Sequence, residues 1–313
     1  MKKISVLLFI LTLLLTACST ASKNTSKDKS PEASSLTESV QKTGGSVAES
    51  KSENSNALTF RKAFPDFALA NKVAHSFGKK IDDGTSEEEL ASLTGEFTIL
   101  NYWDENNKEY DCYDLTGIGY LKGITEFGCY KNSVTALPPE IKELNNLKVL
   151  NLTKAYSLKT IPSEIGELEN LEQIRLASTS VEHLPKEIGN LKKLQDLSIG
   201  AGPLSEIPDE IENLTNLEYL DFHSTKVRTI PNGISNLKKL KKLDMSYLGL
   251  SQLPENFGNL TQLESLNLFR NDLKTLPRSM SKMKNLKWMN IFDNNDLSED
   301  YKNFIPNEAW KVN

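Results

Sequence analysis

Cysteine and histidine are both scarce in this chain, which has three residues of each among its 313. The cysteines are Cys18, Cys112 and Cys129, and no second Cys or His pair accompanies them at the spacing of a zinc site. We therefore expect no bound metal and no cofactor. Cys112 and Cys129 stand where the pattern described below requires apolar, inward residues, so they are either a disulfide of an exported protein or two buried thiols.

Positive charge is also in short supply, since 37 Lys and Arg face 42 Asp and Glu and the net charge is −5. An acidic chain without a basic stripe is poorly suited to nucleic acid, because binding to phosphates depends on clustered Lys and Arg. The lysine-rich run "LKKLKKL" at 237–243 contains leucines that face inward, so its lysines spread over a solvated rim. We therefore expect no nucleic-acid partner.

Long hydrophobic runs are missing as well. The apolar run "ISVLLFILTLLL" at 4–15 is shorter than the ~20 residues that a membrane-spanning helix needs. Lys2 and Lys3 precede it, and "LTAC" ends at Cys18, which is the layout of a signal peptide. One interpretation is an ordinary secretory peptide with a cysteine near its cleavage site.

The other interpretation rests on the Ala-Cys end of this segment, which resembles the lipobox of bacterial lipoproteins. In that family the cysteine is diacylated and becomes the first residue of the mature chain. The resemblance implies a lipoprotein signal peptide over residues 1–18 and a membrane attachment through the lipid on Cys18. It also implies a location on the outer face of the bacterial cytoplasmic membrane.

Apolar residues almost disappear from residues 19–57, which are rich in Ser, Thr, Lys, Glu and Asn. Such a segment cannot bury a core, and it is predicted to be a disordered tether. As a flexible coil it would average about 35 Å end to end, enough to hold a folded domain away from a membrane.

A string of about 23 residues then recurs, as in "LPKEIGNLKKLQDLSI" at 184–199 and "IPNGISNLKKLKKLDM" at 230–245. Eight copies begin at Leu121, Leu144, Leu168, Leu191, Leu214, Leu237, Leu260 and Met283. The Leu-x-x-Leu-x-x-Leu-x-Leu pattern resembles the leucine-rich repeat, whose copies stack because one copy alone cannot bury its apolar face. The resemblance implies an α/β solenoid over residues 121–297, an arc with a parallel sheet on its concave side.

Each copy predicts one short strand with alternating inward and outward residues. In the fifth copy Leu220 and Phe222 face inward, while Tyr219, Asp221 and His223 face outward onto the concave side.

One position departs from the family pattern. Leucine-rich repeats usually carry Asn eleven residues after the first leucine, where the buried amide satisfies backbone groups of the turn. Asn132, Asn271 and Asn294 fit, but the middle copies hold other residues, such as Ala155 and Leu248. We expect the turns to be less regular there.

The repeats need capping ends, because terminal copies otherwise expose their core. Residues 58–120 predict a helical N-terminal cap and an opening repeat, with Leu69, Val73 and Phe77 on one helical face, and Ser86 with Glu89 as a capping box. The string "FPDFALANKVAHSFGKK" resembles the cap of internalin-type bacterial proteins, and "DLTGIGYLKGIT" at 114–125 resembles the start of their repeats. Residues 298–313 predict a short C-terminal cap beginning at Ser298.

The outward strand positions supply the candidate ligand-binding residues. Aromatic side chains gather there in the later copies, beside several charged ones, although the inward leucines already supply the core. Rings with a few polar groups are typical of recognition surfaces. The alternative is that neighbouring rings only stack on one another. The candidates are Arg175, Asp196, Tyr219, Asp221, His223, Asp244, Phe269, Trp288 and Phe292.

No catalytic residue is predicted. His223, Asp221 and Ser246 collect the residue types of a hydrolytic triad, but an open, shallow face offers no strained turn to present the serine. We expect a monomeric, lipid-anchored binding protein that recognises a protein or peptide on its concave face. The alternative is a binder of envelope glycans that stacks sugars on the aromatic face. A hydrolase that uses the same face with His223 is a more remote alternative.

Overall fold

The structure is a computed structural model that describes residues 57–99, 102–103 and 109–305. The predicted signal peptide, Cys18, nearly all of the predicted tether and residues 306–313 of the predicted C-terminal cap lie outside these residues. Among the helices that are described, none combines the length and the apolar character that crossing a bilayer requires.

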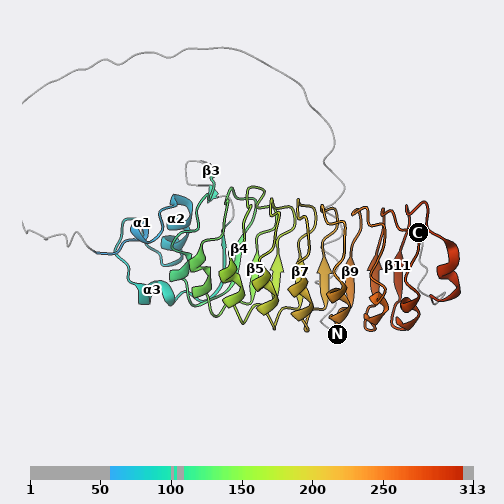
Figure 1. Cartoon of the computed structure of the whole chain (residues 1–313). Helices are drawn as coiled ribbons and strands as arrows, with labels where there is room; N and C mark the ends of the chain where they lie inside the picture. Colours follow the sequence, from blue (N-terminus) through green and yellow to red (C-terminus); the bar gives the residue numbers. More distant parts are fainter. Residues whose placement is uncertain (1–56, 100–101, 104–108, 306–313) are drawn as a thin grey trace, which may run out of the picture. The chain divides into compact units, whose positions relative to one another are not determined.

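One parallel sheet runs the length of the repeats, with nine strands within the described residues (Figure 1). Each strand pairs with the strand of the next copy, so chain order and sheet order agree apart from an inserted hairpin. The strands are β1 (Gly95–Ile99), β4 (Ile124–Cys129), β5 (Val149–Asn151), β6 (Gln173–Arg175), β7 (Asp196–Ser198), β8 (Tyr219–Asp221), β9 (Lys242–Asp244), β10 (Ser265–Asn267) and β11 (Trp288–Asn290). The predicted solenoid with a parallel sheet is confirmed.

The opposite limb of each copy holds a short 3-10 helix. A proline precedes each of these helices except η7, and it fixes φ and removes a donor that strand pairing would need. A buried Ile, Phe or Met from each helix plugs the far side of the core. The helices are η2 (Pro139–Glu143), η3 (Ser163–Glu167), η4 (Lys186–Asn190), η5 (Asp209–Asn213), η6 (Asn232–Asn236), η7 (Phe257–Asn259) and η8 (Arg278–Lys282).

The core lies between the sheet and this limb. The inward strand residues Leu220 and Phe222 are both fully buried, as the alternation predicts. The expectation of irregular turns in the middle copies is wrong. A residue in the left-handed region follows every strand from β4 to β11, and within the described residues these are Lys131, Lys154, Ser178, Ala201, Ser224, Tyr247, Arg270 and Asp293.

Two contacts explain why the turns stay regular without the family asparagine. The N–H of the left-handed residue donates to the next copy, as from Ser224 to the Ser246 carbonyl at 2.9 Å. Where Thr225 replaces Asn, its hydroxyl donates to the Phe222 carbonyl at 2.9 Å. Asn271 shows the family arrangement, since its buried amide donates to two carbonyls and accepts from two N–H groups.

Three helices precede the sheet: α1 (Phe60–Ala63), α2 (Phe67–Ser76) and α3 (Glu87–Ala91). The capping box predicted for α3 forms only by half. Ser86 accepts from the Glu89 N–H at 3.1 Å, but the Glu89 carboxylate contacts the Lys79 ammonium at 2.6 Å. A charge-assisted contact is stronger than one with a backbone N–H, so Lys79 takes the carboxylate.

The sequence analysis did not predict β1, which extends the sheet by one strand beyond the repeats and pairs with β4. A two-stranded hairpin, β2 (Tyr102–Trp103) with β3 (Glu109–Tyr110), and the 3-10 helix η1 (Ile118–Tyr120) connect them. At the other end η9 (Glu299–Asn303) begins after Ser298, as predicted, and takes 3-10 form.

Candidate binding surface

The outward side of β4–β11, called the sheet face from here on, carries three columns of side chains. The first column runs through Asp196, Tyr219, Lys242, Ser265 and Trp288, which pair in register across adjacent strands. The second runs through Ser198, Asp221, Asp244, Asn267 and Asn290. The outward strand positions therefore line up across the sheet, as the alternation predicts. The third column follows the strand ends and includes His223, Ser246, Phe269 and Phe292.

The second column has a structural role that the sequence analysis missed. Each Asp or Asn side chain accepts a hydrogen bond from the backbone N–H two residues on, at 2.9 to 3.2 Å, just where the strand ends. These acceptors are Asn151, Asp221, Asp244, Asn267 and Asn290. Either Asp or Asn can accept this hydrogen bond, so the turn does not require the negative charges of Asp221 and Asp244.

Asp221 is buried, although the alternation predicts an outward, wet position. Its Oδ1 lies 2.7 Å from His223 Nδ1, and its Oδ2 accepts from the Ser198 hydroxyl at 3.1 Å. This hydrogen bond to Asp221 raises the pKa of His223 above 6.5. Burial, followed by the nearby carboxylates of Asp221 and Asp244, raises the pKa of the Tyr219 phenol.

Asp196 and Arg175 form an ion pair on adjacent strands, with Nη2 of Arg175 3.3 Å from Oδ2 of Asp196. Burial raises the pKa of Asp196 in spite of the guanidinium. Its other oxygen, Oδ1, is buried and accepts no hydrogen bond from the described part of the chain. Arg175 Nη2 also donates to the Gln173 side-chain oxygen at 2.9 Å, so both predicted candidates already have partners on the sheet face.

Three rings gather where β9, β10 and β11 end, and we call Tyr247, Phe269 and Phe292 the aromatic ledge. Phe269 and Phe292 stack with centroids 6.1 Å apart, and Tyr247 meets Phe269 edge-on at 5.1 Å. The Arg270 guanidinium carbon lies 5.4 Å from the Tyr247 centroid, and Arg270 Nε pairs with Asp293 at 2.9 Å. The predicted alternative of ring stacking is thus seen for Phe269 and Phe292.

Sequence reasoning missed Tyr247 and Arg270 because both occupy the left-handed turn position rather than a strand column. Trp288 and Tyr219 belong elsewhere on the face, since they begin β11 and β8 and do not follow the strand ends. Both are half-buried.

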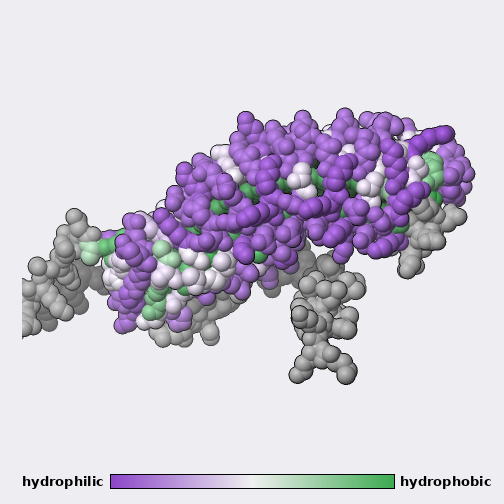
Figure 2. Space-filling view, turned by 90° about the horizontal axis from the view of Figure 1, so that it is seen from below, coloured by the Kyte–Doolittle hydropathy of each residue, from purple (hydrophilic) through white to green (hydrophobic). Residues whose placement is uncertain are grey.

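Large hydrophobic side chains are exposed at few places within the described residues: Phe67, Tyr113, Tyr156, Tyr247 and Phe292. The surface in Figure 2 is mostly hydrophilic, with hydrophobic residues showing along the repeats only as a narrow line. Among these five exposed residues the ledge stands out, because Tyr247 is 46% and Phe292 56% exposed while both touch a third ring.

The triad-like residues divide into separate pairs. The Ser246 hydroxyl donates to Asp244 at 2.6 Å, while His223 contacts Asp221. No hydrogen bond joins Ser246 to His223 among the described residues, so the serine lacks the imidazole contact of a Ser-His-Asp triad. No group of three or more His, Cys, Asp or Glu in the described ranges could hold a metal ion.

Cys112 and Cys129 are both buried, and they are free thiols in this structure. A hydrogen bond with Cys129, together with burial, raises the pKa of the Cys112 thiol well above its ordinary range. A raised pKa keeps the Cys112 thiol protonated, and a protonated thiol is a poor nucleophile.

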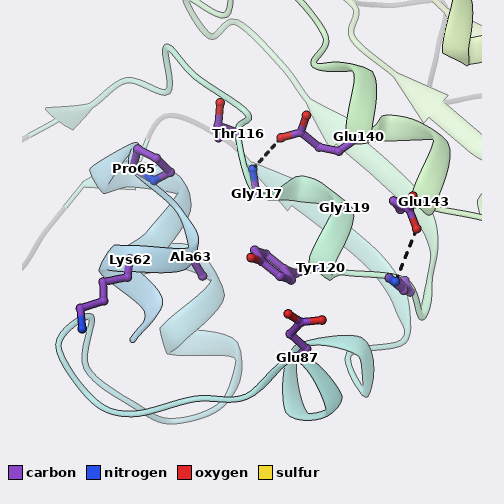
Figure 3. A pocket seen from close by; sticks show the side chains of 11 residues that line it. Lys62, Ala63, Pro65, Glu87, Thr116, Gly117, Gly119, Tyr120, Glu140 and Glu143 are labelled. Atoms are coloured by element: carbon purple, nitrogen blue, oxygen red, sulfur yellow. Dashed lines mark hydrogen bonds and ion pairs between the residues drawn. The ribbon is translucent and has the colours of Figure 1, made fainter. Parts of the chain in front are cut away.

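A pocket of about 350 Å³ that sequence reasoning did not find lies where the cap meets the first repeats (Figure 3). Tyr120 projects into it, and Glu140 accepts from the Gly117 N–H at 3.1 Å. Gly117 has φ 92°, and a Cβ there would lie 2.1 Å from the Ala63 carbonyl oxygen. Glycine at this position therefore lets the cap pack against η1.

The family described as leucine-rich repeat region matches residues 88–203 and 165–249, together just over half of the chain. The chain belongs to the leucine-rich repeat family. It is 34% identical over 84 residues to internalin J of Listeria monocytogenes serotype 4b (strain F2365). That match covers 25% of this chain and only 8% of internalin J.

Two solved structures extend the comparison. A leucine-rich-repeat protein of Leptospira interrogans is 31% identical with a TM-score of 0.53, over 58% of this chain and 52% of that one. Internalin C2 of Listeria monocytogenes is 23% identical with a TM-score of 0.61, over 77% of this chain and 99% of that one. The second likeness shows the fold.

Proposed function

We propose that this chain is a lipid-anchored binding protein of the bacterial cell surface that recognises a protein or peptide on its sheet face. In this proposal Cys18 carries the lipid and residues 19–57 form the tether. The repeats that follow the cap present the binding surface, and the protein is a monomer. The signal-peptide layout ending at Cys18 and the likeness to internalin J support the bacterial surface setting.

The aromatic ledge carries the proposal. Folding of the repeats depends on the inward leucines, which are fully or almost fully buried. A cluster of exposed rings lowers the solubility of a protein, and such clusters typically mark interaction sites. Aromatic side chains also contribute much of the binding energy of protein interfaces. The face around them offers amides, hydroxyls and carboxylates, which are suited to the polar rim of a protein contact.

A photo-crosslinking amino acid at Ser265, which pairs in register with Trp288 on the sheet face, tests the proposal in living cells. The matched control places it at Asp209, exposed on η5 on the other limb. We expect one protein to be captured from Ser265 and not from Asp209. Capture from Asp209 alone would move the binding site to the other limb.

Phe292→Ala then measures the contribution of the ledge to binding the captured partner. We expect a loss of about 2 kcal/mol of binding with a melting temperature close to wild type, because the ring is more than half exposed. Purified wall polysaccharide is added as a competitor in the capture experiment. If it reduces the capture that depends on Phe292, the face binds an envelope glycan and not a protein.

A further inference from the structure

Asp244 differs from the other two aspartates of the sheet face in its partners. Asp196 faces Arg175 and Asp221 faces His223. Asp244 Oδ1 accepts from the Ser246 N–H and hydroxyl, and its Oδ2 accepts from the Asn267 amide at 2.9 Å. All three donors are neutral, so within the described residues this carboxylate is oriented but has no cationic partner.

The surroundings leave the charge of Asp244 available. Its side chain is partly exposed, and Asp221 lies directly opposite it on the neighbouring strand and adds negative potential. Lys242 begins the same strand, and its ammonium makes no ion pair with Asp244 among the described residues. A fixed carboxylate in a partly desolvated position attracts an ammonium or guanidinium group.

The aromatic ledge lies close enough for one short segment to use both features. Asp244 is in register with Asn267 on β10, and Asn267 is in register with Asn290 on β11. Two of the ledge rings, Phe269 and Phe292, come two residues after Asn267 and Asn290. Neighbouring strands are ~4.8 Å apart and each residue adds ~3.3 Å along a strand. Measured diagonally across the sheet, the backbone of Asp244 is therefore about 8 Å from that of Phe269 and about 12 Å from that of Phe292.

This separation restricts the partner. In a polyproline II segment, side chains three residues apart lie on the same side at about 9 Å, which falls between the two distances above. In a β-strand, alternate side chains are only about 7 Å apart, which is shorter than both. The partner needs no acidic residue opposite Arg270, because the Arg270 guanidinium already pairs with Asp293 and lies over two rings.

We infer that the sheet face binds an extended peptide segment of a partner protein in which Lys or Arg is three residues away from an aromatic or large aliphatic residue. The cation contacts Asp244, and the apolar side chain rests on the ledge. This inference rests on the proposed function, since it names the chemistry of the partner that the same face recognises.

Fluorescent peptides test the inference on the full chain, purified in detergent. Each peptide carries one Arg and one Phe, separated by one to five positions in a proline-rich background. A matched set replaces Arg by citrulline, which keeps the shape and removes the charge. We expect the tightest binding at a separation of three and a loss of about tenfold or more with citrulline.

Protein variants locate the contact. Asp244→Asn keeps the turn acceptor, as Asn267 and Asn290 do in their copies, so the fold is retained. It should weaken the Arg peptide about tenfold and leave the citrulline peptide unchanged. Asp209→Asn, the same charge change on the exposed η5 limb, should leave both peptides unchanged.

The outcomes separate the inference from the proposed function. Equal binding of the Arg and citrulline peptides, another optimal separation, or no binding to any peptide would overturn the inference. If Phe292→Ala still weakened capture of the cellular partner, the proposed function would stand without it. If Phe292→Ala changed neither peptide binding nor capture, both would fail.

Discussion

His223 Nδ1 lies 2.7 Å from Asp221 Oδ1, and the His223 backbone N–H donates to the same oxygen at 3.0 Å. The Asp221 carboxylate is buried, whereas the His223 side chain is partly exposed. His223 therefore supplies both the backbone N–H of the turn contact and the ring that pairs with the carboxylate. The contact makes the charge state of His223 relevant to the stability of the middle repeats.

The first prediction concerns pH. The folded pKa of His223 lies above the unfolded value near 6.5, so the native state holds the proton more tightly. Its stabilising contribution is complete below the unfolded pKa and is lost as the pH rises through the folded pKa. Denaturant midpoints measured from about pH 5 to 9 should therefore fall across that window, and His223→Gln should flatten the fall. His183→Gln, at an exposed histidine, should keep the wild-type profile; if it flattened the profile equally, the assignment to His223 would be wrong.

The second prediction concerns Gly200, whose missing side chain makes room for the same imidazole. A Cβ at Gly200 would lie 2.3 Å from His223 Nδ1 and 2.5 Å from Cε1. Gly200→Ala should push the ring off Asp221, cost about 1 kcal/mol and reduce the pH dependence of unfolding. Gly84→Ala is the control, because its Cβ would meet nothing closer than 4.0 Å. A Gly200→Ala protein with the wild-type pH profile would contradict the geometry.

The third prediction concerns the coupling of the repeats. Leu220 is fully buried between neighbouring copies, so Leu220→Asp places an unpaired carboxylate in the core. We expect a loss of about 4 kcal/mol or more, with hydrogen exchange increased in adjacent copies as well as in its own. Thr229→Asp adds the same charge at an exposed site and should unfold like wild type. Local exchange confined to one copy would mean that the array does not unfold as a unit.

The fourth prediction concerns the anchor. If Cys18 carries the only lipid, Cys18→Ser should abolish incorporation of an alkyne-labelled fatty acid and release the processed protein from the membrane fraction. Ser22→Ala, four residues along the same segment, should remain membrane-bound and labelled. A processed Cys18→Ser protein that stayed with the membrane would show that another attachment exists.

Much of the fold could be predicted because the sequence is periodic. In a stack of copies, the long-range neighbours of Leu220 are residues one period away, such as Leu197 and Leu243. A repeated string therefore records its own tertiary contacts, and the alternation of Leu220 with its outward neighbours follows from strand geometry. Strand β1 lies outside the period, and no comparable signal marked it.

The candidate surface could be predicted only in part. The columns and several of their aromatic residues followed from the alternation, but Tyr247 and Arg270 reach the ledge from a left-handed turn that the strand pattern does not cover. The turns themselves stayed regular in copies without the family asparagine, because the next copy supplies the hydrogen bonds.

The sequence by itself determined the period, the inward residues and the order of the strands, since these depend on spacing along one chain. Tertiary structure alone decided which partner each polar side chain takes. Glu89 turned to Lys79 in place of its own helix end, Asp221 became buried against His223, and Asp244 was left without a cation. These outcomes depend on which side chains face one another across neighbouring copies, where hydrogen bonding and burial compete over distances of a few ångströms.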